Sequence, residues 1–133
     1  MGNQTYFSIP GVASVTWVEA KGLMLVWWEG WANSTEFTAL LDAEVRGLRE
    51  HGGSRLLADC RLQRVLSSDD QQRANRDWVP RAVEAGLKRF AVVLPLSDMA
   101  AGHIQERLSE VSGPAFEVAY FTTVDDAEAW LRG

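Results

Sequence analysis

Two short runs of consecutive apolar residues constrain the fold of this chain more than any other feature. They are Leu23–Trp28, which reads "LMLVWW", and Phe90–Leu94, which reads "FAVVL". Successive side chains of a β-strand point to opposite faces of the sheet, so a strand without polar positions must be covered on both faces. Such strands are typical of parallel or mixed sheets flanked by helices. We therefore expect an α/β fold with Phe90–Leu94 as its central strand.

An antiparallel hairpin is predicted to open this sheet. Val12–Ala20 contains β-branched and aromatic residues, Lys21-Gly22 provides a turn, and Leu23–Trp28 provides the second strand. A helix is predicted to begin at Asn33, whose side chain can accept from a free amide of the first turn, with Glu36 at capping-box spacing.

The rest of the chain alternates predicted helices and strands. The first helix is expected to end at Gly52-Gly53. It is followed by a strand over 55–60, a helix over 67–85 with a break or kink at Pro80, and the strand Phe90–Leu94. A helix from Met99 to Val111 capped by Asp98, a strand over 116–121 and a helix over 123–131 complete the chain. The order β-β-α-β-α-β-α-β-α predicts a single mixed β-sheet of about five strands with helices packed against it.

Composition and charge argue against several classes of function. Eighteen acidic against thirteen basic side chains give a formal net charge of −5, which opposes binding to nucleic acid or to an anionic membrane surface. The sole cysteine, Cys60, cannot form an internal disulfide, which fits a reducing cytoplasm. The first residues, "MGNQTYFSIP", lack the basic start and apolar run of a secretory signal, and no stretch approaches the roughly 18 apolar residues of a membrane span. We expect a cytoplasmic protein.

Two motifs resemble the STAS-like proteins related to sporulation stage II protein AA, the SpoIIAA-like family. They are "DWVPRAVEAGLKRFAVV" over Asp77–Val93 and "FTTVDDAEAWL" over Phe121–Leu131. Each joins a helix and an apolar strand, and the element order agrees over about residues 12–132. The resemblance implies one STAS-like domain over residues 1–133 that serves as a binding or regulatory module, in a family also likened to lipid-binding domains with apolar grooves. It does not imply catalysis.

The chain departs from the branch of STAS proteins that act as anti-anti-sigma factors. That branch carries an Asp-Ser-Ser-Gly type loop with a phosphorylated serine, whereas the corresponding stretch here is "ADCRLQRVLSSDD". Ser67 and Ser68 are followed by Asp69 and Asp70. A phosphate there would gain from the helix amino terminus but would be repelled by the two carboxylates. Despite this departure, a partner-switching regulator that is phosphorylated at Ser67 or Ser68 is an alternative function.

Three tryptophans predict a ligand pocket at one edge of the sheet. Trp28 ends a predicted strand, Trp31 follows it, and Trp78 lies on the helix predicted over 67–85. Ligands of open α/β sheets bind beyond the carboxyl ends of the strands, where Trp31 and the loop after Asp59 are expected. The alternative is that the indoles fill the core and pack under a helix.

The densest basic region of the chain follows Asp59. Its arginines could hold an anionic head group; alternatively, those on the helix form i,i+4 pairs such as Asp69 with Arg73 and Asp77 with Arg81. The predicted ligand-binding residues are Trp28, Trp31, Asp59, Arg61, Arg64 and Trp78.

Residues that could form a catalytic or metal site are few and scattered. His51 stands beside a helix stop, and His103 has no carboxylate at metal-ligand spacing. We expect a non-enzymatic module that binds an apolar or amphipathic small molecule or a protein partner, without a metal or cofactor. A third candidate function is that of a small enzyme using Asp59, Cys60 or His103. It requires those groups to lie within hydrogen-bond distance of one another in a cleft. Self-association into a homodimer stays open.

Overall fold

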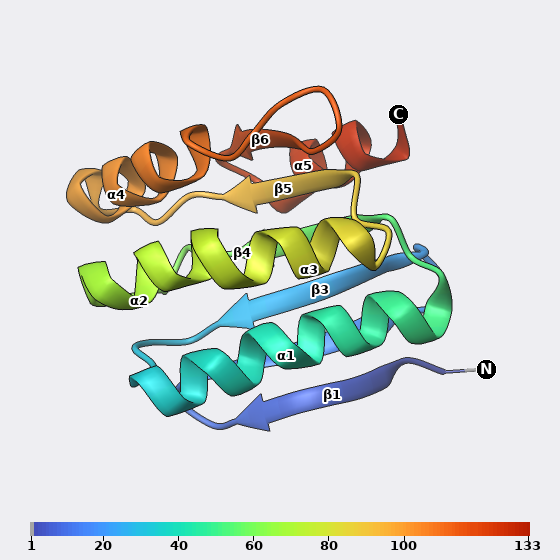
Figure 1. Cartoon of the computed structure of the whole chain (residues 1–133), viewed down its shortest axis with the longest axis horizontal. Helices are drawn as coiled ribbons and strands as arrows, with labels where there is room; N and C mark the ends of the chain where they lie inside the picture. The colour runs from blue at the N-terminus through green and yellow to red at the C-terminus, as the bar shows by residue number, and fades with distance from the viewer. Residues whose placement is uncertain (1) are drawn as a thin grey trace.

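Six strands form one mixed sheet in which neighbours in sequence are also neighbours in space. The structure, a computed structural model, describes residues 2–133, and its strand order is β1-β2-β3-β4-β5-β6 (Figure 1). The pairs β1–β2 and β2–β3 are antiparallel, whereas β3–β4, β4–β5 and β5–β6 are parallel. The strands are β1 (Gln4–Ile9), β2 (Ala13–Val18), β3 (Leu23–Trp28), β4 (Arg55–Asp59), β5 (Arg89–Val93) and β6 (Glu117–Phe121).

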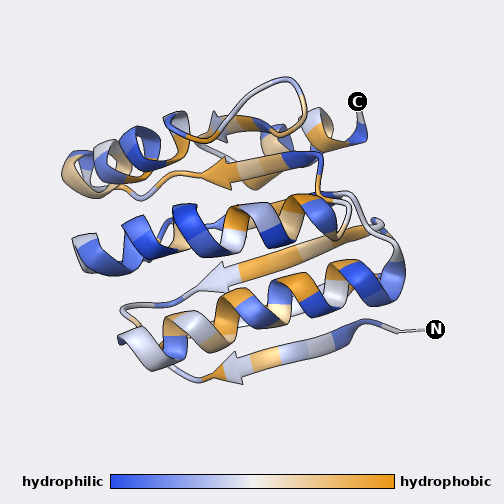
Figure 2. Cartoon of the chain, in the orientation of Figure 1, coloured by the Kyte–Doolittle hydropathy of each residue, from blue (hydrophilic) through white to orange (hydrophobic). Residues whose placement is uncertain are grey.

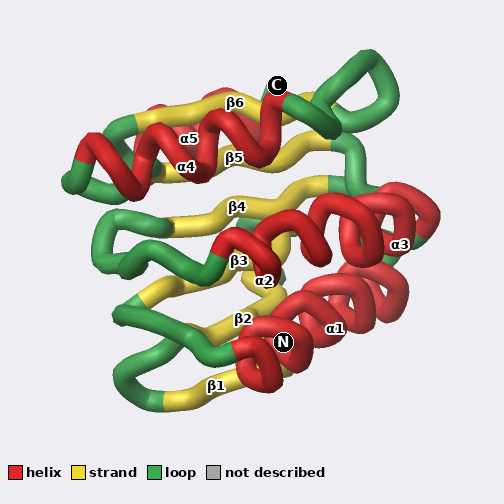
Figure 3. Tube along the Cα trace, turned by 60° about the vertical axis from the view of Figure 1, so that its left-hand side comes forward, coloured by secondary structure: helices red, strands yellow, loops and turns green. Residues whose placement is uncertain are grey.

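Helices cover the two faces of this sheet unequally. The segments α1, α2, η1, α3 and α4 pack on one face, which we call the α1 face; Figure 3 shows α1 and the α2–α3 segment as a layer beside the strands. Within residues 2–133, α5 is the only helix on the opposite face, which we call the α5 face, and it lies over β4, β5 and β6. The helical segments are α1 (Ser34–His51), α2 (Ser68–Arg73), the π-helical turn η1 (Ala74–Trp78), α3 (Val79–Glu84), α4 (Asp98–Ser109) and α5 (Val124–Arg132).

The first helix is fixed at both ends by local chemistry and in its middle by packing. The Asn33 side chain accepts from the backbone N–H of Glu36 at 2.8 Å, and the Glu36 carboxylate accepts from the backbone N–H of Asn33 at 3.0 Å. Gly52 ends the helix in the left-handed region, with φ 59°. In between, Gly47 lets α1 approach β3, since a Cβ there would lie 2.6 Å from Sδ of Met24.

The apolar positions lie where the helices meet the sheet. Figure 2 shows the hydrophobic residues along the inner strands, with helix surfaces that alternate between apolar and hydrophilic stripes. On β3, Met24, Val26 and Trp28 are buried toward the α1 face. On the other face of the same strand Leu23 is buried, but Leu25 and Trp27 stay half-buried because α5 packs farther along the sheet. The expectation that Leu23–Trp28 is covered on both faces is therefore met on one face only.

The predicted hairpin, the capping box and the parallel crossovers are confirmed, but the predicted strand count is one short. The additional strand is β1, which pairs antiparallel with β2. Three of its residues, Gln4, Thr5 and Ser8, are exposed, so an apolar pattern could not reveal this edge strand. Because the strands lie in sequence order, Phe90–Val93 is on an inner strand that is second from the β6 edge of the sheet, and the prediction of a central position was wrong.

Two predicted helix details also need correction. The helix over 67–85 is interrupted at the π-helical turn Ala74–Trp78, which ends two residues before Pro80, and Pro80 itself lies in the first turn of α3. The cap of α4 is Ser97, whose Oγ accepts from the backbone N–H of Ala100 at 3.3 Å, and Asp98 is the first helical residue. Across residues 2–133, no helix combines the length and the apolar character needed to cross a membrane.

Candidate functional site

A small cavity lies between the α1 face of the sheet and three helical segments. Its volume is about 40 Å³. Most of its wall is apolar, but α1 contributes Glu44, η1 contributes Trp78, α4 contributes Arg107, and Cys60 follows the end of β4. The apolar lining includes Trp28, Phe37, Leu40, Ala58, Phe90 and Ile104.

Three polar atoms of this lining are buried without a hydrogen-bond partner in the protein. They are Oε2 of Glu44, Nε1 of Trp78 and Nε of Arg107. Glu44 and Trp78 are only 4% and 2% exposed, so water outside the protein does not solvate them. Leaving such a group unpaired costs about 1–3 kcal/mol, and native proteins rarely tolerate it without a reason. Among residues 2–133 these are also the only unpaired side-chain atoms of this kind, and all three line one cavity.

Burial changes the protonation of the groups around the cavity. It raises the pKa of Glu44 to about 8, although the charge of Arg107 acts in the opposite direction. Burial likewise raises the pKa of the Cys60 thiol. Burial lowers the pKa of Arg107, while the nearby Cys60 and Glu44 groups raise it, and a guanidinium stays charged in proteins. At neutral pH the lining therefore holds one cation, a neutral carboxyl group and a neutral thiol.

The sequence places Glu44 in the interior through helical spacing. Glu44 comes four residues after Leu40 and four before Leu48, so it occupies the apolar stripe of α1 that faces the sheet. Glu44 was not predicted as a site residue, because the buried stripe of this helix was identified from its apolar members alone. A carboxylate that interrupts such a stripe was the available signal.

Arg107 was missed for a similar reason, and its position depends on the π-helical turn. It stands three residues after Ile104, beside the buried stripe of α4. Its Nη1 donates to Oδ1 of Asn75 at 3.3 Å, and Nδ2 of Asn75 donates to the carbonyl oxygen of Arg107 at 2.8 Å. The turn that carries Asn75 also carries Trp78. Single π-turns inside helices are frequently found at functional sites, and no residue pattern in the sequence predicted this one.

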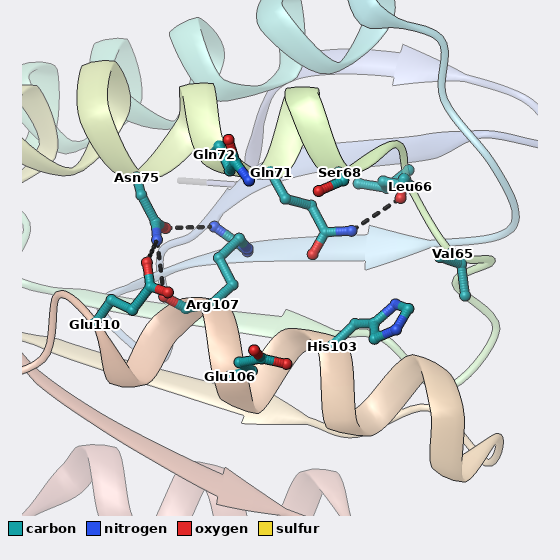
Figure 4. A pocket seen from close by; sticks show the side chains of 10 residues that line it. All are labelled: Val65, Leu66, Ser68, Gln71, Gln72, Asn75, His103, Glu106, Arg107 and Glu110. Atoms are coloured by element: carbon teal, nitrogen blue, oxygen red, sulfur yellow. Dashed lines mark hydrogen bonds between the residues drawn. The ribbon is translucent and has the colours of Figure 1, made fainter.

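An open groove adjoins the cavity on the outside of the molecule (Figure 4). It has a volume of about 330 Å³ and runs between α4 and the α2–η1 segment. Arg107 lines both the groove and the cavity, and a smaller hollow lined by Gln63, Leu66 and Ile104 shares residues with each. The groove residues are Val65, Leu66, Ser68, Gln71, Gln72, Asn75, His103, Glu106, Arg107 and Glu110.

The structure brings two of the three predicted pocket tryptophans together. Trp28 and Trp78 both line the cavity, and each also packs on a phenylalanine, Trp28 on Phe37 and Trp78 on Phe90, with ring centroids 6.0 and 5.9 Å apart. Trp31 is 50% exposed and does not line the cavity. The predicted cluster is therefore present for two indoles, whereas the third lies on the surface.

Of the predicted Asp59 to Arg64 loop, Cys60 and Gln63 line the cavity, whereas the predicted ligand-binding residues Asp59, Arg61 and Arg64 do not. Leu57 packs beneath α5, so Asp59, two residues farther along the strand, faces the same side. Its buried carboxylate accepts from Nε of Arg61 at 2.9 Å and from Nη2 at 2.7 Å. The side chain of Arg64 is exposed, and its backbone N–H donates to the carbonyl oxygen of Gly30 at 3.1 Å.

The helix arginines pair differently from the predicted i,i+4 pattern. Arg73 lies 3.7 Å from Asp70, one turn earlier on the same helix. Arg81 donates to Asp42 of α1 at 2.8 Å and so joins two helices. Arg81 and Asp42 are both exposed, whereas the Asp70 carboxylate is buried, and in both pairs a carboxylate already occupies the guanidinium.

The residues of the two alternative functions lie in separate places. Cys60 lines the interior cavity, His103 is exposed in the groove, and Asp59 is engaged by Arg61 on the opposite face. Ser67 is the cap of α2, where its Oγ accepts from the backbone N–H of Asp70 at 3.1 Å. Ser68 lines the groove.

Comparison with known proteins identifies the fold. No protein-family model matches the chain, and no curated protein matches it. The chain is similar in structure to an uncharacterized protein of the DUF3478 family with a SpoIIAA-like fold from Shewanella loihica PV-4, with a TM-score of 0.57 over 98% of this chain and 93% of that chain. The two are 15% identical in sequence. The protein therefore has a SpoIIAA-like α/β fold, as the motifs over Asp77–Val93 and Phe121–Leu131 predicted.

Proposed function

We propose that this protein is a non-enzymatic binding module that holds an amphipathic small molecule in the cavity and the adjoining groove. The observation that carries the proposal is the convergence of three unpaired polar atoms, from Glu44, Trp78 and Arg107, on one cavity. The three residues come from three different helical segments, so irregular local geometry in one helix does not explain why all three atoms are unpaired.

The shape of the site supports a ligand that is only partly buried. Small-molecule sites are lined mainly by apolar and aromatic side chains with a few polar groups that fix orientation. The cavity has that character, but its volume of about 40 Å³ holds only a small chemical group. The groove of about 330 Å³ provides room for the rest of the molecule, with Arg107 at the boundary.

The arrangement of the candidate catalytic groups supports a binding role over catalysis. A nucleophilic cysteine requires a lowered pKa and a neighbouring base. Burial instead raises the pKa of Cys60, and this effect outweighs the opposing charge of Arg107. His103 lies on the groove side of α4, and no hydrogen bond joins it to Cys60 or Asp59 among the described residues.

The proposal is tested by native mass spectrometry of the purified protein. We expect a noncovalent adduct of discrete mass that is released on denaturation. Ala58 lines the cavity, so Ala58→Val narrows it and should reduce the adduct. Ala119 pairs with Ala91 on the α5 face, so Ala119→Val is the matched control and should retain the adduct. An adduct that survives Ala58→Val as well as Ala119→Val would place the ligand elsewhere and contradict the proposal.

A further inference from the structure

The unpaired groups of the cavity are all able to donate hydrogen bonds, which defines the chemistry of their partner. An indole Nε1 and a guanidinium Nε can only donate, and these are the unpaired atoms of Trp78 and Arg107. Glu44, which burial keeps protonated at neutral pH, adds a carboxyl O–H. A ligand group that fits this lining must accept several hydrogen bonds.

The charge of the cavity lining also favours a ligand group that accepts hydrogen bonds. Among residues 2–133 no carboxylate lies within ion-pair distance of Arg107. Its side chain instead bonds to the neutral Asn75 (Figure 4). A cation that is partly buried without a counter-charge is costly. An anionic ligand group would supply that counter-charge, whereas a cationic group would be repelled.

The volumes decide how such a ligand is oriented. The cavity of about 40 Å³ has room for a group of about three heavy atoms, since roughly 10–15 Å³ accommodates one water-sized group. The groove beyond Arg107 is much larger and carries the carboxylates of Glu106 and Glu110. A second negative charge on the ligand would therefore be unfavourable there.

We infer that the ligand is a small monocarboxylic acid. Its carboxylate enters the cavity and accepts hydrogen bonds from Trp78 Nε1, Arg107 Nε and the Glu44 carboxyl group, while its uncharged body lies in the groove. This inference rests on the proposed function, since it names the ligand class of the same site.

The first test compares three probes of equal chain length by isothermal titration calorimetry at pH 7: hexanoate, 1-hexanol and hexylamine. Charge-assisted hydrogen bonds are about twice as strong as neutral ones, so we expect hexanoate to bind at least roughly tenfold more tightly than either of the others. Equal or tighter binding of hexanol or hexylamine would overturn the carboxylate assignment and leave the proposed function standing. Binding of none of the three would contradict both.

The second test uses pH, which separates a contact with the ligand from a structural role. Ionisation of Glu44 above its pKa of about 8 would place a second carboxylate against that of the ligand. Between pH 7 and pH 9 we expect hexanoate affinity to fall by roughly tenfold, as the protonated fraction falls. Glu44→Gln keeps a donor and cannot ionise, so it should remove most of this loss. The matched control Glu106→Gln, in the groove, should retain it.

The charge of Arg107 is tested separately. Arg107→Gln should weaken hexanoate binding by at least roughly tenfold and change hexanol binding little, whereas Arg49→Gln, at an exposed position of α1, should change neither. If Arg107→Gln does not fold, the ranking of the three probes and the pH profile of Glu44→Gln still decide the question. Full hexanoate affinity in a folded Arg107→Gln protein would overturn the inference.

Discussion

Arg107 and Asn75 bind each other twice across the groove. Nη1 of Arg107 donates to Oδ1 of Asn75 at 3.3 Å, and Nδ2 of Asn75 donates to the backbone carbonyl oxygen of Arg107 at 2.8 Å (Figure 4). The pair joins α4 to the π-helical turn, and it fixes the guanidinium at the boundary between groove and cavity. The side-chain amide of Asn75 thus holds both the backbone of α4 and the guanidinium of Arg107 in place.

Asn75→Ala should therefore destabilise the protein and loosen Arg107. Loss of these two hydrogen bonds, together with the longer one from Nδ2 of Asn75 to Oε2 of Glu110 at 3.4 Å, is expected to lower the free energy of unfolding by roughly 1–2 kcal/mol. Urea unfolding measures this change. Gln72→Ala is the matched control, because Gln72 lines the same groove at an exposed position. Equal effects of the two substitutions would show that the Asn75 contacts contribute nothing.

Two glycines inside helices are expected to respond oppositely to the same substitution. A Cβ on Gly47 would overlap Cε of Met24 and lie 2.6 Å from its Sδ, whereas a Cβ on Gly102 meets no atom within 4 Å. Gly47→Ala should destabilise the protein by about 1–3 kcal/mol through overpacking, because the Met24 side chain that must move aside is fully buried. Gly102→Ala should stabilise it by roughly 0.5–1 kcal/mol, because alanine is the better helix former. Thermal unfolding of both variants checks the difference in sign, and stabilisation by Gly47→Ala would contradict the close approach of α1 to β3.

Arg61 and Arg64 are both exposed arginines of one loop, yet only one is expected to affect stability. Arg61 binds the carboxylate of Asp59, which is 3% exposed, through two nitrogen atoms. Arg61→Ala leaves that buried carboxylate without its guanidinium partner, so the midpoint of urea unfolding should fall. Arg64→Ala removes an exposed side chain and should leave the midpoint close to that of the wild type. A similar midpoint for both variants would mean that Arg61 contributes no more than Arg64.

Local chemistry was sufficient to predict most of the fold. The capping box of Asn33 and Glu36 acts within four residues, and the glycine stop at Gly52 needs only a left-handed backbone. Consecutive apolar residues required strands with cover on both faces, and this holds fully for Phe90–Val93. The edge strand β1 was not predicted, because its position is determined by pairing with β2 and not by an apolar pattern of its own.

The candidate site was predictable only in part, for a physical reason. Trp28 and Trp78 were predicted correctly because tryptophan is typical of apolar cores and pockets wherever it occurs in a sequence. Glu44 and Arg107 are ordinary charged helix residues in the sequence, and only the packing of α1 and α4 on one sheet buries them together. Asp59 and Arg61 were expected at the ligand, but strand alternation turns Asp59 to the opposite face.

The buried carboxyl group of Glu44 makes the stability of the protein depend on pH in a definite direction. Its pKa is raised in the folded state from 4.5 to about 8, so the folded protein binds this proton more tightly than the unfolded chain does. The corresponding stability is fully present below pH 4.5 and is lost as the pH rises toward 8. The loss is on the order of 1 kcal/mol per pH unit within that window. Arg107 and Cys60 face the same group, but Arg107 stays charged and burial keeps the Cys60 thiol neutral throughout.

Glu44→Gln should remove this pH dependence, because glutamine keeps the shape of the side chain and cannot ionise. Urea unfolding at pH 5, 6, 7 and 8 should show the wild type losing stability faster than the variant, and at pH 8 the variant should be the more stable of the two. Glu106→Gln, at an exposed position of α4, should follow the wild-type profile. Parallel profiles for wild type and Glu44→Gln would show that Glu44 reaches solvent in the folded protein. The cavity would then lack one of its three donors at neutral pH, since a solvated carboxyl group is ionised there.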